Sequence, residues 1–146
     1  MVTKKLRTST LLNRISQASN IQDCLSKNEE QMCLPEFSAF ITALSKQRGI
    51  APQRIIEKAN IENSFGHQLF KGTRRASRDT VLLLAFGFEA DLELAQELLR
   101  NARMAQLYPR VKRDAALIYC FSHHMSAIEA QALLQELALP LLGGNK

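Results

Sequence analysis

Two short helices joined by a tight turn are predicted by the stretch Arg54–Ser77, which reads RIIEKANIENSFGHQLFKGTRRAS. The first predicted helix begins at Pro52, because the missing N–H of proline costs nothing in the first turn of a helix. It ends at Asn60, since asparagine tolerates the left-handed backbone of a sharp turn. The second helix spans about residues 63–70, stops at Gly72 and is followed by a basic loop. This order of elements describes a helix-turn-helix.

More helices are predicted on both sides of this stretch. Between Pro35 and Gly49, four apolar residues recur at the spacing of one buried helix face, and residues 79–88 are apolar nearly all round, which indicates a central buried helix. Ser126 and Glu129 fit a capping box at the start of the last helix. The other predicted helices are Thr10–Ser19, Asn20–Glu30, Asp91–Ala105, Lys112–His123 and Ser126–Ala138. Because strand-like alternation is not evident, and neither is a repeat of about 20–50 residues, the predicted fold class is all-α without internal repetition.

Length and composition limit the classes of protein to which the chain can belong. With 146 residues, 46% of them hydrophobic and 23% charged, it fits one ordinary domain or a small domain with an extension. Its longest uncharged apolar run, Val81–Phe88, is far shorter than the roughly 20 residues of a membrane span. The basic N-terminus lacks the apolar stretch of a secretory signal. We therefore expect a soluble, cytoplasmic protein.

Neither a metal site nor an enzyme active site is predicted. Three cysteines, Cys24, Cys33 and Cys120, are an odd number without a C-x-x-C pair. We therefore expect reduced and mostly buried thiols instead of disulfides or a structural zinc site. The sequence contains no recognisable catalytic motif, phosphate-binding glycine loop or paired carboxylate set. We expect no cofactor and no catalytic residues.

Positive charge is concentrated in the front and middle of the chain. Residues 31–80 carry eight basic and four acidic side chains, whereas residues 81–146 carry six and seven. Within the first group, the segment Lys71–Arg78 holds four basic residues among its eight. A polyanion is the natural partner of such a cluster, and a solvated loop without a partner is the alternative.

Several residues of the central stretch stand where one family of helix-turn-helix proteins has its characteristic residues. Gln53 is the glutamine that begins the first helix, Asn60 is the turn residue and Ile61 is the buried aliphatic residue after the turn. In the second helix, Ser64-Phe65 is the pair of a small and an aromatic residue, and Gln68-Leu69 stands at its second inward-facing turn. Gly72 is the glycine that ends this helix. With them, residues 35–88 resemble the lambda-repressor-like, XRE-type helix-turn-helix family.

Two positions depart from the pattern of this family. Ile56 stands where the family has a small alanine, which predicts that the two helices sit further apart or at a shifted angle. Gly66 stands where a branched apolar residue is usual, which predicts a weaker second helix or a close approach of its backbone to another group. Glu62, at the start of the second helix, is expected to cap that helix.

The resemblance implies a DNA-binding surface on the second helix. The major groove admits one helix, and side chains of asparagine, glutamine, lysine and histidine can pair with base edges there. The expected base-reading residues are Asn63, Ser64, His67, Gln68 and Lys71, and the expected phosphate-binding residues are Gln53, Arg54, Arg74, Arg75 and Arg78. The implied function is that of a bacterial or phage-encoded, repressor-like transcriptional regulator that binds double-stranded DNA sequence-specifically. The alternative is a helical protein–protein interaction module, antitoxin-like or an adaptor, that reuses the fold.

Three regions are predicted along the chain: an N-terminal helical segment (1–34), the helix-turn-helix domain (35–88) and a helical extension (89–146). The extension is expected to form a homodimer or to dock a protein partner, since two recognition helices must reach half-sites about 34 Å apart. The candidate interface residues are Leu133, Leu134, Leu137 and Leu141. The alternative is that these leucines close the core of the monomer.

Overall fold

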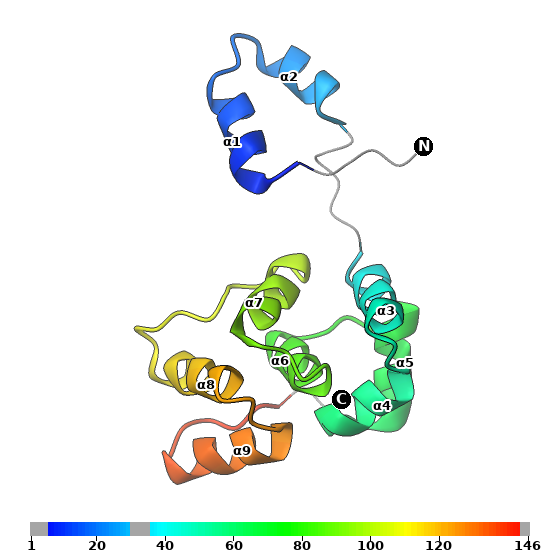
Figure 1. The fold of residues 1–146 in the computed structure, drawn as a ribbon, viewed down its shortest axis with the longest axis vertical. Coiled ribbons are helices and arrows are strands. Elements are labelled where there is room, and N and C mark those ends of the chain that lie inside the picture. Colours follow the sequence, from blue (N-terminus) through cyan, green and yellow to red (C-terminus); the bar gives the residue numbers. More distant parts are fainter. Residues whose placement is uncertain (1–5, 30–35, 144–146) are drawn as a thin grey trace. The chain divides into compact units, whose positions relative to one another are not determined.

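The computed structural model describes residues 6–29 and 36–143, in which the chain forms nine α-helices and no strand (Figure 1). The prediction of an all-α fold is therefore confirmed. The chain divides into two compact units, unit 1 (residues 1–34) and unit 2 (residues 35–146). Two sequence predictions, the place of Pro35 in a first helical turn and the state of Cys33, lie outside the described residues.

Unit 1 consists of two short helices, α1 (Thr8–Ser16) and α2 (Ile21–Lys27). Arg14 of α1 donates a hydrogen bond to the side-chain oxygen of Asn28, just after α2, at 3.1 Å. Among the described apolar residues of this unit, only Cys24 is buried. Unit 1 therefore has almost no apolar core of its own.

Unit 2 holds the other seven helices of the described chain, each close to its predicted place. They are α3 (Phe37–Arg48), α4 (Pro52–Ala59), α5 (Asn63–Lys71), α6 (Arg78–Gly87), α7 (Leu92–Asn101), α8 (Lys112–Ser122) and α9 (Ala127–Glu136). The predicted capping box is present at α9, where Ser126 and Glu129 exchange hydrogen bonds between side chain and backbone. The helix-turn-helix of the sequence corresponds to α4 and α5.

Local backbone signals decide where most of these helices end. Gly49, Asn60 and Gly72 follow α3, α4 and α5 in the left-handed conformation, with φ of 67°, 59° and 84°. Each of these three ends was predicted from the residue type. The helix after Asp91 is shorter than predicted, because Arg103 adopts the same conformation at φ 59° and stops the helix.

One apolar core runs through all of unit 2. Every residue of α6 from Thr80 onward is buried, as predicted for a central helix. Buried side chains extend from Ile41 in α3 to Leu142 near the end of the described chain. The predicted helix-turn-helix domain (35–88) and helical extension (89–146) therefore share a single core within unit 2.

The four leucines predicted at a dimer interface lie in different environments. Leu134 has no exposed surface and belongs to the core, so its assignment to an interface is corrected. Leu133 is partly buried against that core. Leu137 and Leu141 remain 51% and 48% exposed.

Unit 2 contains an internal repeat, contrary to the prediction. The pairs α6–α7 and α8–α9 are equivalent helical hairpins whose matching residues lie 35 positions apart. The left-handed residues correspond: Glu89 and His124 have φ of 55° and 54°, and Arg103 and Ala138 have φ of 59° and 58°. The shared residues are few, namely Arg78-Asp79 with Arg113-Asp114, Leu82 with Leu117, Phe86 with Phe121, Ala95-Gln96 with Ala130-Gln131, Leu98-Leu99 with Leu133-Leu134, and Leu107 with Leu142.

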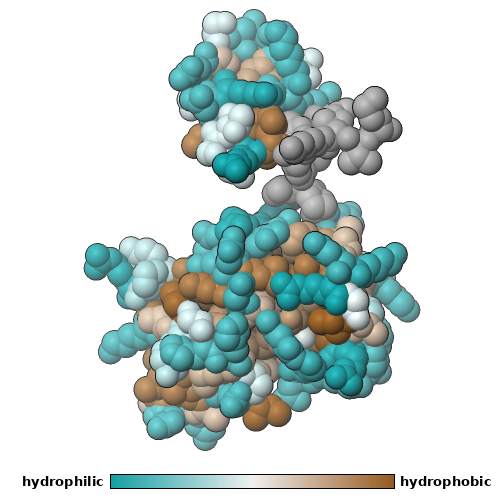
Figure 2. Space-filling view, in the orientation of Figure 1, coloured by the Kyte–Doolittle hydropathy of each residue, from teal (hydrophilic) through white to brown (hydrophobic). Residues whose placement is uncertain are grey.

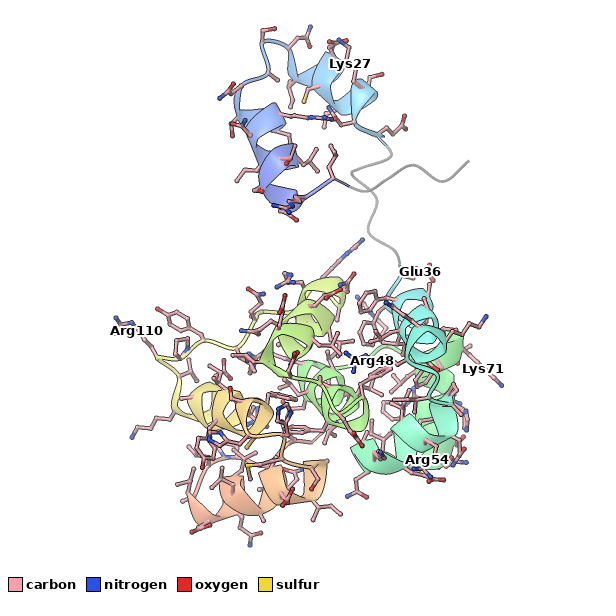
Figure 3. The ribbon with its side chains drawn as sticks, in the orientation of Figure 1. Lys27, Glu36, Arg48, Arg54, Lys71 and Arg110 are labelled. Atoms are coloured by element: carbon pink, nitrogen blue, oxygen red, sulfur yellow. The ribbon has the colours of Figure 1, made fainter. Side chains whose placement is uncertain are left out.

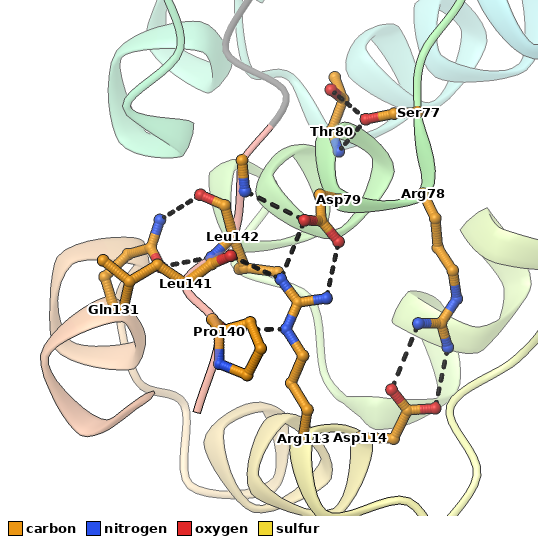
Figure 4. Close-up of polar contacts among 11 residues, drawn as sticks. Ser77, Arg78, Asp79, Thr80, Arg113, Asp114, Gln131, Pro140, Leu141 and Leu142 are labelled. Atoms are coloured by element: carbon orange, nitrogen blue, oxygen red, sulfur yellow. Dashed lines mark hydrogen bonds and ion pairs between the residues drawn. The ribbon is translucent and has the colours of Figure 1, made fainter. Parts of the chain in front are cut away.

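The two hairpins exchange ion pairs (Figure 4). Arg78 of the first hairpin donates to both carboxylate oxygens of Asp114, at 3.2 and 2.9 Å. In return, Arg113 of the second hairpin donates to both carboxylate oxygens of Asp79, each at 2.9 Å. Such reciprocal contacts between equivalent residues are characteristic of a twofold arrangement. The hairpins are therefore related by a pseudo-twofold axis within one chain.

The surroundings of Asp79 favour its charged form. Burial acts to raise the pKa of this carboxyl group, but the hydrogen bonds from Arg113 and from the N–H of Gly143 outweigh it. With the added charges of Arg113 and Arg78, the pKa of Asp79 falls below its ordinary value of 3.8. The carboxylate thereby joins α6 to α8 and to the end of the described chain.

Candidate nucleic-acid interface

The second helix of the motif, α5, has one buried and one accessible face. Phe65 and Leu69 are 6% and 1% exposed and fix the buried face, as predicted. All five predicted base-reading residues keep accessible surface: Asn63, Ser64 and Lys71 are exposed, and His67 and Gln68 are half-buried. The structure therefore brings these five residues together on one helix outside the core.

Glu62 forms the N-terminal cap of α5, as predicted. Its carboxylate accepts hydrogen bonds from the backbone N–H groups of Ser64 and Phe65, at 3.1 and 2.7 Å. These N–H groups have no partner within the helix, and the negative charge is favourable at the positive end of the helix dipole. The acidic residue next to the candidate interface thus has a structural role.

The two departures from the family pattern, Ile56 and Gly66, face each other between α4 and α5. A Cβ atom on Gly66 would lie 2.6 Å from Cγ2 and 2.7 Å from Cγ1 of Ile56, which is closer than such atoms can approach. Ile56 is 1% exposed, so its side chain fills the space above the glycine. The large residue is on α4 and the small one is on α5. The close approach predicted for the Gly66 backbone is therefore present, and its partner is Ile56.

A hydrogen-bonded chain of side chains links α4 to the outer face of α5. The Oε1 atom of Gln53 lies 2.7 Å from Nε2 of His67, and the Gln53 amide donates to Glu57 at 3.1 Å. Because Gln53 Oε1 can only accept in this orientation, Nε2 of His67 carries the hydrogen and Nδ1 points elsewhere. Glu57 was not predicted in this role, although its spacing of four residues from Gln53 on one helix was a usable signal.

Exposed cations border α5. Figure 3 shows Arg54 and Lys71 on the part of unit 2 that α3, α4 and α5 form. Arg74 and Arg75 follow in the loop after Gly72, and both are exposed. The guanidinium of Arg74 lies 5.5 Å from the ring centroid of Phe65, so this arginine is held close to α5. Within the described residues, no ion pair engages these four cations.

Arg78 does not belong with these cations. Besides its two bonds to Asp114, it donates to the backbone carbonyls of Ala105 and Gln106, at 3.0 and 3.2 Å. These contacts use Nε and both terminal nitrogens of the guanidinium. The prediction that Arg78 holds phosphate is therefore corrected: its side chain joins α6 to α8.

A metal site is not found in the part of the chain that the structure describes. That part holds no group of three or more histidine, cysteine or acidic side chains that could bind a metal ion. None of its helices combines the length and apolar character that a membrane crossing requires. Comparison with protein families, with curated proteins and with solved structures gives no match to this chain.

Proposed function

We propose that unit 2 binds double-stranded DNA sequence-specifically through α5 and that the chain is a repressor-like transcriptional regulator. One observation carries this proposal: α5 keeps an accessible polar face while Phe65 and Leu69 are buried, and unpaired cations border that face. A helix that only packs against a core needs no exposed cations beside its polar face. The candidate base-reading residues are Asn63, Ser64, His67, Gln68 and Lys71.

The dimensions of α5 support this role. Its nine residues give a length of about 13 Å at roughly 1.5 Å per residue. The major groove is about 12 Å wide and admits one helix. Asn63 and Gln68 can each pair with adenine, and Lys71 can donate to the acceptors of guanine. Because base pairs are stacked about 3.4 Å apart, a helix of this length reaches roughly four of them.

Phosphate binding is proposed for Gln53, Arg54, Arg74 and Arg75. The three arginines supply the charge, and Arg74 and Arg75 stand just beyond the C-terminal end of α5. Phosphate contacts of this kind hold a helix in register without reading sequence. Each neutralised phosphate releases counterions, so binding must weaken as salt is added.

The test compares arginine variants of the full chain on DNA selected from a random duplex pool. We expect Arg74→Ala and Arg75→Ala each to weaken binding and to lower the slope of log affinity against log salt by about 0.9 for each phosphate that the variant no longer neutralises. Arg110→Ala is the matched control, because Arg110 is an exposed arginine of the loop between α7 and α8 (Figure 3). Loss of binding equal to that of the control, or no salt-sensitive binding by the unchanged protein at low ionic strength, would refute the proposal.

The second candidate function is that of a protein–protein interaction module. It is favoured by one observation, an apolar groove at the surface of α8 and α9, where Figure 2 shows hydrophobic side chains. The same binding experiment separates the two candidates, since a module of this kind selects no DNA sequence.

A further inference from the structure

The side chains of Glu57, Gln53 and His67 are joined by hydrogen bonds that cross from α4 to the outer face of α5. The amide nitrogen of Gln53 donates to Oε1 of Glu57 at 3.1 Å, and Oε1 of Gln53 lies 2.7 Å from Nε2 of His67. Gln53 and Glu57 are exposed, and His67 is half-buried. We call these three residues the Glu57–Gln53–His67 triad. It links a candidate base-reading residue of α5 to an acidic residue of the other helix.

Glu57 determines which way the amide group of Gln53 is turned. A carboxylate only accepts hydrogen bonds, so it pairs with the amide nitrogen of Gln53 and not with the amide oxygen. With the amide reversed, Oε1 of Gln53 would face an oxygen of Glu57, and no hydrogen would lie between them. The bond to Glu57 therefore leaves Oε1 of Gln53, an acceptor, on the side of His67.

The orientation of Gln53 in turn determines the tautomer of His67. A neutral imidazole carries its single hydrogen on one ring nitrogen and accepts a hydrogen bond on the other. In the triad the hydrogen lies on Nε2, which faces Oε1 of Gln53, so Nδ1 keeps a lone pair. The ring then has only an acceptor left for a base, because its one donor is used by Gln53. The sequence alone leaves both tautomers open.

A side-chain acceptor distinguishes between the bases in the major groove. Adenine and cytosine each present an amino group there, at N6 and at N4, whereas guanine presents two acceptors and thymine an acceptor and a methyl group. We propose that Glu57 is a positioning residue which, through Gln53, holds His67 in the tautomer that accepts a hydrogen bond from the amino group of adenine or cytosine. This inference rests on the proposed function and adds to it the class of base that His67 reads.

The triad is compatible with the proposed contact between Gln53 and phosphate. The amide nitrogen of Gln53 carries two hydrogens, and the bond to Glu57 uses one of them, so the second remains for a phosphate oxygen. The carboxylate of Glu57 itself repels phosphate. If Glu57 acted only through this charge, its replacement would tighten binding to every sequence alike. A positioning residue instead changes which base is preferred.

The first experiment determines the tautomer of His67 in the full chain without DNA. It records ¹H–¹⁵N NMR correlations of the imidazole rings at about pH 8, where imidazole is ordinarily neutral, and identifies the signals of His67 by their loss in His67→Ala. We expect the hydrogen on Nε2 in the unchanged protein. In Glu57→Lys the ammonium group donates to Oε1 of Gln53, so the amide turns its nitrogen towards His67 and the hydrogen should be on Nδ1.

The matched control is Glu93→Lys, which makes the same change of charge at an exposed position of α7. Glu57 is exposed as well, so neither variant removes a buried contact, and both should keep the helical content of the unchanged protein. The control should keep the hydrogen of His67 on Nε2. The same tautomer in Glu57→Lys as in this control overturns the proposal.

The second experiment compares the same three proteins on the random duplex pool. The base pair that His67 reads is the one at which His67→Ala loses its preference. There we expect the unchanged protein and Glu93→Lys to prefer adenine or cytosine over guanine by about tenfold. Glu57→Lys should prefer guanine, because Nδ1 of His67 then donates.

The outcomes separate this inference from the proposed function. Absence of any base pair that depends on His67, or a preference of the unchanged protein for guanine or thymine there, overturns the inference and leaves the proposed function standing. An unaltered tautomer in Glu57→Lys also refutes the inference alone. If none of the three proteins selects a sequence, the proposed function fails and the base-reading role of His67 fails with it.

Discussion

At the scale of single residues, Ile56 and Gly66 show why a position cannot be judged alone. Considered separately, an isoleucine in place of a small residue predicts separated helices, and a glycine within a helix predicts a weak one. In the structure the isoleucine occupies the space that the glycine leaves. The sequence contains both residues, but their contact depends on how α4 and α5 cross, which no local pattern specifies. The two residues that look unfavourable one by one, Ile56 and Gly66, therefore form one closely packed contact.

The contact predicts that Gly66→Ala destabilises unit 2, although alanine is the better helix former by about 1 kcal/mol. The added methyl group overlaps Ile56, and overpacking of this kind costs roughly 1–3 kcal/mol. Ile56→Ala alone should cost about 2–5 kcal/mol through the cavity it leaves. In the double variant the new methyl group enters that cavity, so the combined loss should be smaller than the sum by at least about 0.5 kcal/mol. Urea denaturation measures the free energy of unfolding of the two single variants and the double variant. Losses that simply add would contradict the contact between Ile56 and Gly66.

At the scale of helices, the sequence predicts features that depend on neighbouring residues, such as helix ends. It does not predict contacts between helices that are distant in sequence. The ends of α3, α4 and α5 follow from Gly49, Asn60 and Gly72, and the fold class follows from the spacing of apolar residues. The candidate base-reading face could likewise be predicted, because the buried Phe65 and Leu69 fix which side of α5 faces outward. The role of Arg78 could not, since its partner Asp114 is distant in sequence and reaches it only through the pseudo-twofold pairing.

The repeat also explains two glutamines that hold the ends of the hairpins. Gln96 of α7 bonds both the N–H and the carbonyl of Leu107, at 2.8 and 3.0 Å, and Gln131 of α9 does the same for Leu142, at 2.8 Å each. We predict that Gln96→Ala and Gln131→Ala each cost about 1–3 kcal/mol, because each leaves backbone groups of a buried leucine without partners. Gln135→Ala, at an exposed position of α9, is the control and should be nearly neutral. If the Gln131→Ala variant unfolds at the same urea concentration as this control, the hydrogen bonds of Gln131 do not stabilise the second hairpin as those of Gln96 stabilise the first.

At the scale of the whole molecule, one core couples the candidate DNA-binding helices to the remaining helices of unit 2. Residues 35–88 and 89–146 were predicted as separate regions because the resemblance to a helix-turn-helix family covers only residues 35–88. The structure joins them because α6 is buried on all sides, by α4 on one face and by the second hairpin on another, where the rings of Phe86 and Phe121 stack with centroids 4.2 Å apart. A family resemblance marks a stretch of sequence, whereas the extent of a core depends on which helices meet.

The ion pairs between the two hairpins make the stability of unit 2 sensitive to acid. The pKa of Asp79 is lowered in the folded chain, so its carboxylate stabilises the fold above the ordinary pKa of 3.8, and this contribution is lost as the pH falls through the lower folded value. The urea midpoint of unit 2 should therefore fall steeply below about pH 4, and Asp79→Asn should be less stable than the unchanged protein at pH 7 but lose less on acidification. Glu93→Gln, an exposed acidic residue of α7, is the control and should keep the full acid dependence. An Asp79→Asn variant with the same acid dependence as this control would show that the carboxylate does not hold the hairpins together, because removing it would then have left the proton linkage unchanged.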